Sequence, residues 1–411
     1  MLAVNTEVHL GLKVAARGVE LNDLAAHGRR WGLAMSCEVM ARVLWGLQEG
    51  EFMGVRQGTR EVACPGCGVV HCGPGSLLRR GRRLRVIQTS SGRVRFALRQ
   101  VSCGACRKTF CPFGSALGLR PRQRVAEELV EQLADGVMNL SYEKTSALGR
   151  AWLGGTVGPR TLWRAVQHRG SQVAFTRRAP LDTFLVDGTR VRCGRRQHGE
   201  AAVLGLQLEG REGPARRIQV RKRLLGFGVG REAWPAVLAT GSEAPLVVTD
   251  AASGVREMVS AACPQARHQL CEWHLTHSLK HFLTLHGVRP AKRRTLAREL
   301  AAILRRRSAR ARTAYWAFWR KLRGYRSVAS LLEQAAPYIM YPDRSAERTN
   351  SIAEREMREL NRRTDVGVRW SVSGVRNLLT LKLARRHNPD DYARVWQRKR
   401  PIRWQLVPQP A

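Results

Sequence analysis

Two pairs of closely spaced cysteines constrain this chain more than any other feature. Cys64 and Cys67 form one Cys-x-x-Cys pair, and Cys103 and Cys106 form the other. Between the pairs, apolar residues alternate with arginines on either side of a turn at 90–92, which is typical of a β-hairpin. The two Cys-x-x-Cys pairs can supply four thiolates, which match the tetrahedral coordination that zinc prefers. The pattern therefore predicts a zinc-ribbon-like module with these four ligands.

The same residues leave two alternatives open. A redox Cys-x-x-Cys normally opens the helix of a βαβ unit, and the sequence around these pairs does not predict one. Cys72, Cys111 and His71 lie close enough in the sequence to replace one ligand. Because no catalytic base accompanies the cysteines, we interpret the site as structural.

The charge of the chain indicates its partner. The 411 residues include 71 Lys and Arg against 32 Asp and Glu, giving a formal net charge of +39. So many positive charges repel one another in a compact fold unless a polyanion is bound. We therefore expect a nucleic-acid partner. GC-rich codon usage would explain arginine in place of lysine, but not the shortage of acids.

Two segments are candidates for DNA contact. In the hairpin, Arg93, Arg95 and Arg99 alternate with apolar residues, and we predict that they grip the DNA backbone. From 121 to 170 the pattern is helical, with Ser141 as an N-cap and a glycine break before Pro159. This segment predicts either a helix-turn-helix or a plain helical linker. In the first case Arg160 and Arg164 would contact DNA.

The compartment follows from what the sequence lacks. It contains no run of 18 or more apolar residues, so we expect no membrane span. The first residues, MLAVNTEVHLGLKV, carry charges where a signal peptide would be apolar. We therefore expect a cytoplasmic protein, in which paired cysteines bind metal more often than they form disulfides.

Three acidic residues suggest a second metal site. Asp187 and Asp250 each lie in or at the end of an apolar strand pattern, and Glu354 lies on a later helix. A carboxylate at the end of a buried strand is costly without a cation or a hydrogen-bonding turn. Carboxylates suit Mg²⁺ or Mn²⁺ better than zinc. Asp250 could instead be only a turn or helix cap.

Longer motifs around these acids resemble one family. The stretches 249–256 (TDAASGVR) and 267–274 (RHQLCEWH) are similar to blocks of the Mutator-like transposases, which belong to the RNase H-like DDE enzymes. The stretch 349–354 (TNSIAE), followed by 362–371 (RRTDVGVRWS), resembles their third-acid block. A subset of bacterial insertion-sequence relatives also begins with a cysteine-paired ribbon that runs into a Leu-Gly-Leu segment, here 117–119.

The resemblance implies a fold and an activity. It implies an α/β fold with an RNase H-like mixed sheet, and Asp187, Asp250 and Glu354 as ligands of Mg²⁺ or Mn²⁺. It puts Cys271 and His274 beside the active site, where His274 would donate to the scissile phosphate. The alternative for this pair is a core cysteine and a histidine with its hydrogen bonds satisfied.

The implied activity is cleavage of transposon ends and their transfer into target DNA. The partners would be double-stranded DNA of the ends and the target, bound by a homodimer or larger assembly at the bacterial nucleoid. Two rival functions remain: a metal-dependent nuclease without strand transfer, and a non-catalytic zinc-ribbon DNA-binding protein derived from a transposase.

The expected organisation has five parts. Their predicted bounds are 1–60 for a helical segment, 61–118 for the zinc-ribbon-like module, 119–178 for the helical DNA-binding segment, 179–390 for the catalytic domain with a helical insertion at about 285–345, and 391–411 for a basic tail. In the insertion, Trp316 and Trp319 at helical spacing suggest core packing, with stacking on DNA bases as the alternative.

Overall fold

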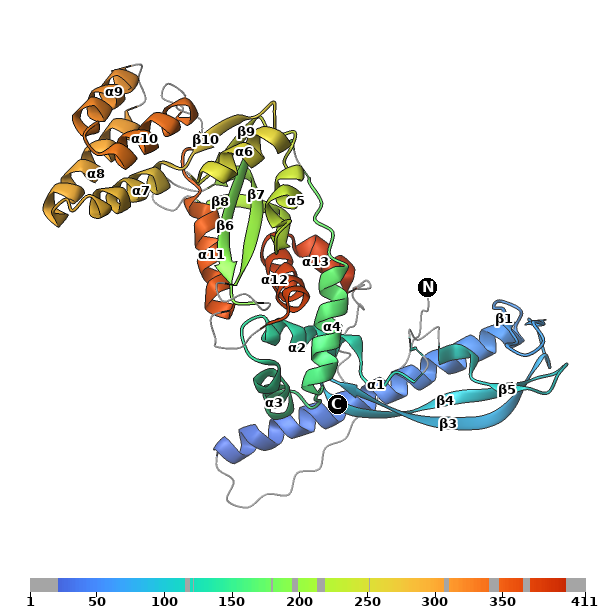
Figure 1. The fold of residues 1–411 in the computed structure, drawn as a ribbon. Coiled ribbons are helices and arrows are strands. Elements are labelled where there is room, and N and C mark those ends of the chain that lie inside the picture. Colours follow the sequence, from blue (N-terminus) through green and yellow to red (C-terminus); the bar gives the residue numbers. More distant parts are fainter. Residues whose placement is uncertain are drawn as a thin grey trace. The chain divides into compact units, whose positions relative to one another are not determined.

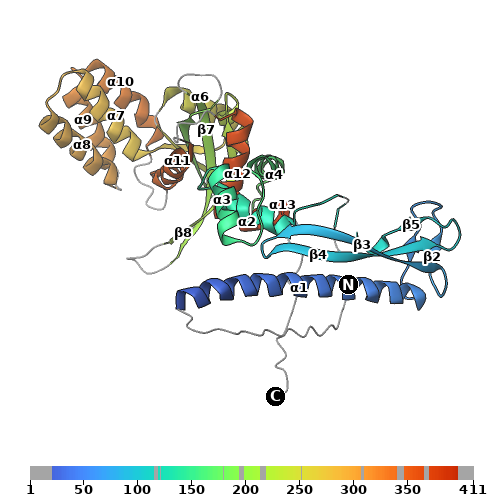
Figure 2. The ribbon, with the colours of Figure 1, turned by 90° about the horizontal axis from the view of Figure 1, so that it is seen from below.

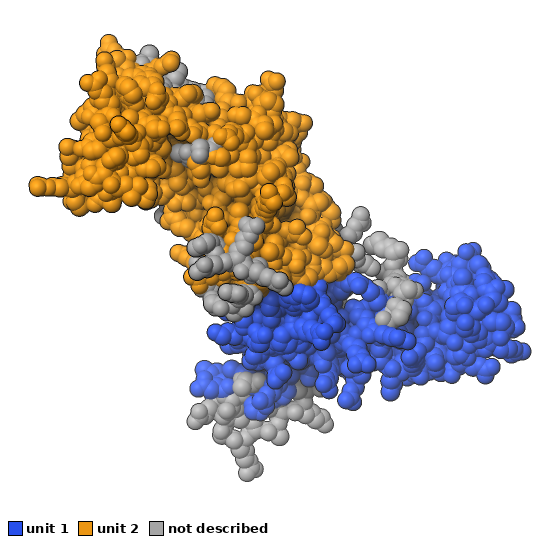
Figure 3. All heavy atoms as spheres, viewed as in Figure 1, with its two compact units in different colours: residues 1–165 blue, residues 166–411 orange. Residues whose placement is uncertain are grey.

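The computed structural model describes most of the chain, in two compact units. The described residues are 21–114, 119–120, 122–178, 180–193, 199–212, 219–250, 252–306, 310–339, 347–364 and 370–396. The units comprise residues 1–165 and 166–411 and are coloured separately in Figure 3. Helices and several sheets confirm the predicted mixed α/β class. None of the described helices has the length and hydropathy needed to cross a membrane.

A long helix and a two-stranded ribbon form most of the first unit (Figure 2). Helix α1 (Leu21–Arg56) runs along the hairpin of β3 (Leu77–Thr89) and β4 (Gly92–Cys103). The inner face of the ribbon packs its apolar side chains on α1, with Val94 and Phe96 almost fully buried against Met40 and Leu44. The predicted helical lead-in is therefore packed on the ribbon.

Helix α1 also covers the open edge of β4. Strand β5 (Thr109–Phe110) pairs with β4 only at 101–102, which leaves backbone groups of residues 97 and 99 unpaired in the sheet. Gln48 of α1 donates to the carbonyl of Ala97 and accepts from the amide of Arg99, both at 2.9 Å. A side-chain amide thus satisfies an exposed strand edge.

Shorter elements complete the first unit. Ser141 caps α3 as predicted, accepting from the Lys144 amide at 3.1 Å. Ser146 of α3 then donates to the carbonyl of Val157 at 2.7 Å, which fixes the turn before α4. The elements are β1 (Val62–Ala63), β2 (Val70–His71), η1 (Pro112–Gly114), α2 (Glu127–Val137), α3 (Tyr142–Trp152) and α4 (Pro159–Ser171), the last of which continues into the second unit.

A five-stranded mixed sheet is the centre of the second unit (Figure 1). Its order is β10-β9-β6-β7-β8. The pairs β6–β7 and β7–β8 are antiparallel, whereas β6–β9 and β9–β10 are parallel. The strands are β6 (Thr183–Val191), β7 (Glu200–Glu212), β8 (Gln219–Val229), β9 (Leu246–Thr249) and β10 (Arg267–Leu270).

Helices cover both faces of this sheet. Alternate residues of β6 point to opposite sides, so Leu185 packs with α11 (Ser351–Thr364) and α12 (Val372–His387). Val186 packs on the other side with α5 (Ala233–Ala239) and α6 (Ser253–Ala262). The parity assigns Asp187 to the face that α11 and α12 cover.

Four helices between β10 and α11 have a core of their own. Leu275 and Leu279 of α7 pack with Tyr315 and Phe318 of α9, so the helical insertion already begins in α7. Trp319 is half-buried and donates to the carbonyl of Ala329 at 3.1 Å, which supports core packing for this side chain. The elements are α7 (Glu272–Leu285), α8 (Pro290–Arg305), α9 (Arg310–Leu322), α10 (Arg326–Ala335) and η2 (Ala336–Tyr338).

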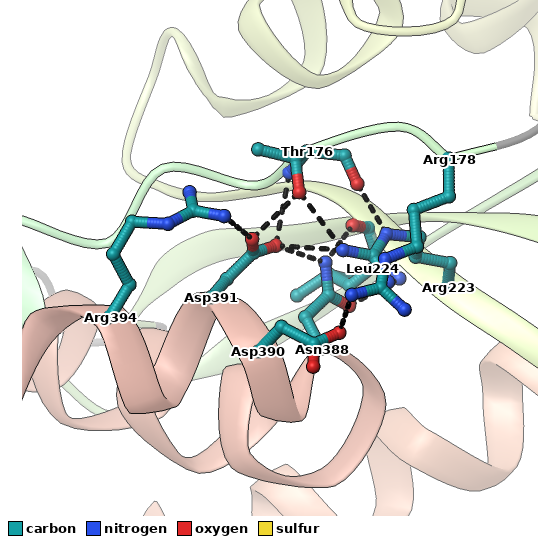
Figure 4. Close-up of polar contacts among 8 residues, drawn as sticks. All are labelled: Thr176, Arg178, Arg223, Leu224, Asn388, Asp390, Asp391 and Arg394. Atoms are coloured by element: carbon teal, nitrogen blue, oxygen red, sulfur yellow. Dashed lines mark hydrogen bonds and ion pairs between the residues drawn. The ribbon is translucent and has the colours of Figure 1, made fainter. Parts of the chain in front are cut away.

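Polar side chains tie the C-terminal helices to the edge strand β8 (Figure 4). Between α12 and α13 (Pro389–Val395), Asn388 accepts from the Leu224 amide at 3.0 Å and donates to the Leu224 carbonyl at 2.9 Å. The carboxylate of Asp391 accepts from Thr176 and Arg223. Although burial opposes it, these hydrogen bonds lower the pKa of Asp391. The network therefore holds the C-terminal helices against β8, the edge strand of the sheet.

Some predicted features lie outside the described residues. They are residues 1–20 of the N-terminal segment, most of the Leu-Gly-Leu motif at 117–119, residues 365–369 of the last motif, and the basic tail from 397 on.

Candidate functional site

The four predicted zinc ligands converge at one end of the ribbon. The sulfurs of Cys64, Cys67, Cys103 and Cys106 all lie within 4.8 Å of one another. The Sγ–Sγ distance is 3.6 Å between Cys64 and Cys106 and 3.7 Å between Cys67 and Cys103. Four sulfurs at tetrahedral Zn–S distances would be about 3.8 Å apart. The donor set and its spacing therefore fit one zinc ion.

Backbone amides already stabilise negative charge on these sulfurs. The amide of Gly66 donates to Cys64 at 3.3 Å, and the amide of Cys106 donates to Cys103 at 3.4 Å. Such hydrogen bonds, with that from the Cys67 amide the strongest, lower the pKa of Cys64 to about 6. A hydrogen bond from the Cys106 amide likewise lowers the pKa of Cys103. A thiolate is the form that binds metal.

The two loops have the same backbone conformation but different residues at one position. Gly68 and Arg107 each follow the second cysteine of a pair, with φ of 73° and 63°. Their amides donate to the carbonyls of Cys64 and Cys103 at 3.0 and 3.1 Å. Glycine adopts this left-handed conformation freely, whereas arginine is strained there.

The alternative zinc ligands Cys72, Cys111 and His71 are not part of the group that the four cysteines form. Cys72 is exposed and its thiol faces the carbonyl of Gly58 at 3.5 Å. Cys111 packs against the apolar side chains of the ribbon, and burial raises its pKa. His71 is buried in β2 and is not part of the group that the four cysteines form.

The predicted row of arginines on the ribbon must be corrected at one position. Arg93 and Arg95 are exposed on β4. Arg99 is only 7% exposed: it is paired with Glu49 and lies over the rings of Trp45 and Phe52 of α1. Strand alternation alone misassigned it, because α1 covers β4 at this level. Arg160 and Arg164 are both exposed near the start of α4.

The register of the second unit's sheet brings two of the predicted acids to the same level. Leu185 of β6 is paired with Val248 of β9 in a parallel arrangement. Asp187 lies two residues further along β6, and Asp250 lies two residues beyond Val248, directly after the end of β9, so the register predicts that the two acids are neighbours. One oxygen of Asp250 accepts from the Ala252 amide at 3.2 Å, so Asp250 also stabilises the turn before α6, but the N-cap of that helix is Ala252.

Asp187 lies where an ionised carboxylate is least stable. It is 4% exposed. Burial, and then the charges of Asp250 and Glu354, raise its pKa to about 7. The charges of Asp250 and Glu354 thus act on Asp187, although within the described chain the three acids are not gathered as closely as the cysteines. A divalent cation would remove this repulsion.

The sequence analysis missed a residue that joins the site. Asn350 is fully buried, and its side chain donates to Asp187 at 3.2 Å. Its amide donates to the sulfur of Cys271 at 3.5 Å, and its carbonyl accepts from the amide of Glu354 at 2.9 Å. The only signal was its place directly before the helix that carries the third acid.

Cys271 and His274 lie at the start of α7. Burial raises the pKa of Cys271 to about 11, so its neutral thiol is a poor metal ligand or nucleophile. The ring of His274 packs edge-on against Trp273 with a centroid distance of 4.9 Å. Its Nδ1 is buried without a hydrogen-bond partner among the described residues. Cys271 thus borders the acidic site through Asn350.

Glu354 and Glu356, two residues apart on α11, have different partners. Glu354 accepts from Arg358, one turn further along α11, at 3.2 Å. Glu356 is 1% exposed and pairs with Lys222 at 2.6 Å and with Arg386 at 3.1 Å. Despite its burial, hydrogen bonds from His387 and Lys222 lower the pKa of Glu356 to about 2. Glu356 therefore belongs to a buried ion cluster.

One family model matches this unit of the chain. The model described as "Transposase, Mutator family" matches residues 188–379. No curated protein matches the chain. The resemblance seen in the sequence is thereby confirmed at the level of the family, and DNA is the partner that this family implies.

Proposed function

Because residues 188–379 are a Mutator-family transposase domain, we propose that this protein cleaves the ends of a DNA element and joins them to target DNA. The observation that carries the proposal is the parallel register of β6, which contains Asp187, with β9, which Asp250 directly follows, together with Asn350, which donates to Asp187 and directly precedes α11 and its Glu354. The strand order, with three antiparallel strands followed by two parallel ones, supports an RNase H-like core.

The donor chemistry fits Mg²⁺ or Mn²⁺. Asp187, Asp250 and Glu354 offer only hard oxygen ligands, and burial, followed by the charges of Asp250 and Glu354, raises the pKa of Asp187. Bound there, two divalent ions would stabilise the charge that develops on the attacking and leaving oxygens of a phosphodiester. In this proposal the three carboxylates hold the metal.

Neighbouring residues would orient the site. Asn350 fixes the carboxylate of Asp187 by its hydrogen bond, and Cys271 fixes Asn350 by accepting from its amide. We assign Cys271 to positioning, since its thiol is neutral. His274, whose Nδ1 has no partner among the described residues, would donate to the scissile phosphate as the resemblance implies.

The first unit would bind the DNA. Its zinc ribbon presents Arg93 and Arg95, and α4 presents Arg160 and Arg164, all exposed. Phosphate contacts of this kind release counterions, so affinity should fall steeply with salt. We expect a dimer or larger assembly to hold two element ends together.

The test is a cleavage and joining assay on duplex DNA that carries the sequences flanking the gene. Asp187→Asn and Glu354→Gln should each reduce cleavage by about 100-fold or more, because the developing charge loses its stabilisation. Binding to the same DNA should change little.

Glu347→Gln and Glu359→Gln are the matched controls. Glu347 accepts from Thr349, and Glu359 pairs with Arg362 on the surface of α11, so neither should matter for cleavage. Cleavage without joined products would favour the nuclease, and full activity of Asp187→Asn would refute the catalytic proposal.

A further inference from the structure

The outer face of the β3–β4 ribbon has a chemistry that a phosphate grip does not need. Leu84 is 82% exposed and Val86 is 45% exposed, whereas the inner face is buried on α1. In the register of the hairpin, Leu84 is opposite Ala97 and Val86 is opposite Arg95. An apolar stripe therefore lies directly beside exposed arginines on one surface.

The charge of the ribbon identifies what covers this face. Residues 77–103 contain eight arginines and neither Asp nor Glu. Arg79 and Arg99 are paired with Glu49 of α1, but an apolar protein partner would leave the other arginines uncompensated, whereas a DNA duplex neutralises them. The exposed arginines Arg93 and Arg95 lie beside this apolar pair, whereas Arg82 lies over the ring of Trp45 of α1, so a duplex held by Arg93 and Arg95 would bring base edges against Leu84 and Val86.

The shape of the ribbon suits the same partner. The major groove of DNA is wide enough for a two-stranded ribbon, and it displays both hydrogen-bonding edges and thymine methyl groups. Arginine is the usual partner of guanine there, and apolar side chains contact the thymine methyl. Both kinds of side chain occur on this face at neighbouring cross-strand positions.

We propose that the outer face of β3 and β4 enters the major groove and reads base sequence, with Arg95 as a hydrogen-bond donor and Leu84 and Val86 as apolar contacts. This inference rests on the proposed DNA-binding function and adds a sequence-reading surface to it. Removing the apolar pair should then change which DNA is chosen more than how tightly DNA is held.

The experiment is selection of preferred sites from a pool of random-sequence duplexes by the full chain with its zinc. The wild-type protein should enrich a motif. The double variant Leu84→Ser/Val86→Ser should lose the preference at some of its base pairs. Its ratio of affinities for the selected and a random duplex should fall about 10-fold, with an unchanged salt dependence.

Two further variants make the result specific. Arg93→Gln/Arg95→Gln should weaken binding to the random duplex as well, and should reduce the slope of log affinity against log salt by about 2. Leu21→Ser is the matched control, because Leu21 is 79% exposed at the start of α1, away from the ribbon face. Unchanged zinc content verifies the fold of each variant.

The possible failures are distinguishable. If Leu84→Ser/Val86→Ser selects the same motif with the same preference at every position, the face reads no bases. If that variant instead turns a DNA-free oligomer into a monomer, the face is a contact between copies of the chain, and the inference is overturned. A wild-type protein that binds no duplex refutes the proposed function itself.

Discussion

The cysteine site of the first unit and the acidic site of the second differ in how complete they are without metal. The sulfurs of the first lie within 4.8 Å of one another. The carboxylates of the second are farther apart, and Asp187 has a pKa of about 7. The pKa of Cys64 is lowered to about 6 while that of Cys67 is raised to about 11, so the packed cysteines carry little mutual repulsion. Carboxylates repel one another, so the second site depends more strongly on its ion.

The two sites also differ in what fixes them. Short loops on one ribbon carry the cysteines, and the contacts between their sulfurs join residues 36 and 42 positions apart in the sequence. Asn350 and Asp187, joined by a hydrogen bond, are 163 positions apart in the sequence. A local site can be held by its own loops, whereas a site built from distant segments needs buried linking residues. The comparison predicts different consequences for damage to each.

The largest effect should follow from loss of one cysteine. Cys103→Ser should reduce bound zinc from about one per chain to almost none, and should unfold the ribbon end of the first unit. Structural zinc contributes roughly 10–16 kcal/mol to the folding of small zinc modules. Elemental analysis and thermal unfolding measure both effects. Cys72→Ser is the control, and loss of zinc there as well would contradict the assignment.

Disruption of the buried ion cluster should have the next largest effect. Glu356→Gln should destabilise the second unit by about 3–5 kcal/mol, because Lys222 is left without its carboxylate. Since the pKa of Glu356 is lowered to about 2, its contribution is complete above the ordinary value of 4.5 and is lost as pH falls toward 2.

A comparison of Glu356 with the acidic site gives a second test. Cations of the protein pair with Glu356, whose pKa is lowered, whereas burial and neighbouring acids raise the pKa of Asp187. Unfolding measured against pH should therefore show more acid lability in the wild type than in Glu356→Gln, which retains the contribution of Asp391. Equal lability in both proteins would mean that the cluster contributes nothing.

Asn350 should matter for the acidic site and not for the ribbon. Asn350→Ala removes the donor to Asp187 and should weaken divalent-metal binding or cleavage about 10- to 100-fold, as loss of an orienting neighbour commonly does. Asn350→Asp retains the size but lacks the donor and should not restore activity. A dependence of cleavage on Mn²⁺ concentration that is unchanged in Asn350→Ala would exclude the positioning role.

The smallest effect concerns the two cysteine loops. Arg107 has φ of 63°, where the first loop has Gly68, so Arg107→Gly should stabilise the first unit by about 0.5–1 kcal/mol without altering zinc content. Gly68→Ala should destabilise it by at least as much. Chemical denaturation measures both variants, and destabilisation by Arg107→Gly or stabilisation by Gly68→Ala would show that the two loops are not equivalent.

The sequence predicted what depends on local pattern. The hairpin, the cysteine quartet and the Ser141 cap follow from patterns within short segments, whereas the mixed sheet was implied by the resemblance to the Mutator-like transposases. Arg99 was misplaced because alternation says nothing of α1, whose Trp45 and Glu49 cover it. The role of Asn350 was missed because its contacts to Asp187 and Cys271 exist only after distant segments meet.

The central claim is that Asp187, Asp250 and Glu354 hold divalent metal, and Mn²⁺ binding followed by electron paramagnetic resonance tests it most directly. In protein with its zinc intact, the wild type and Glu347→Gln should bind Mn²⁺ at the second unit. Asp187→Asn should lose this binding and keep its zinc. Binding should also weaken as pH falls below about 7, because protons then compete for Asp187. Wild-type affinity for Mn²⁺ in Asp187→Asn would contradict the account.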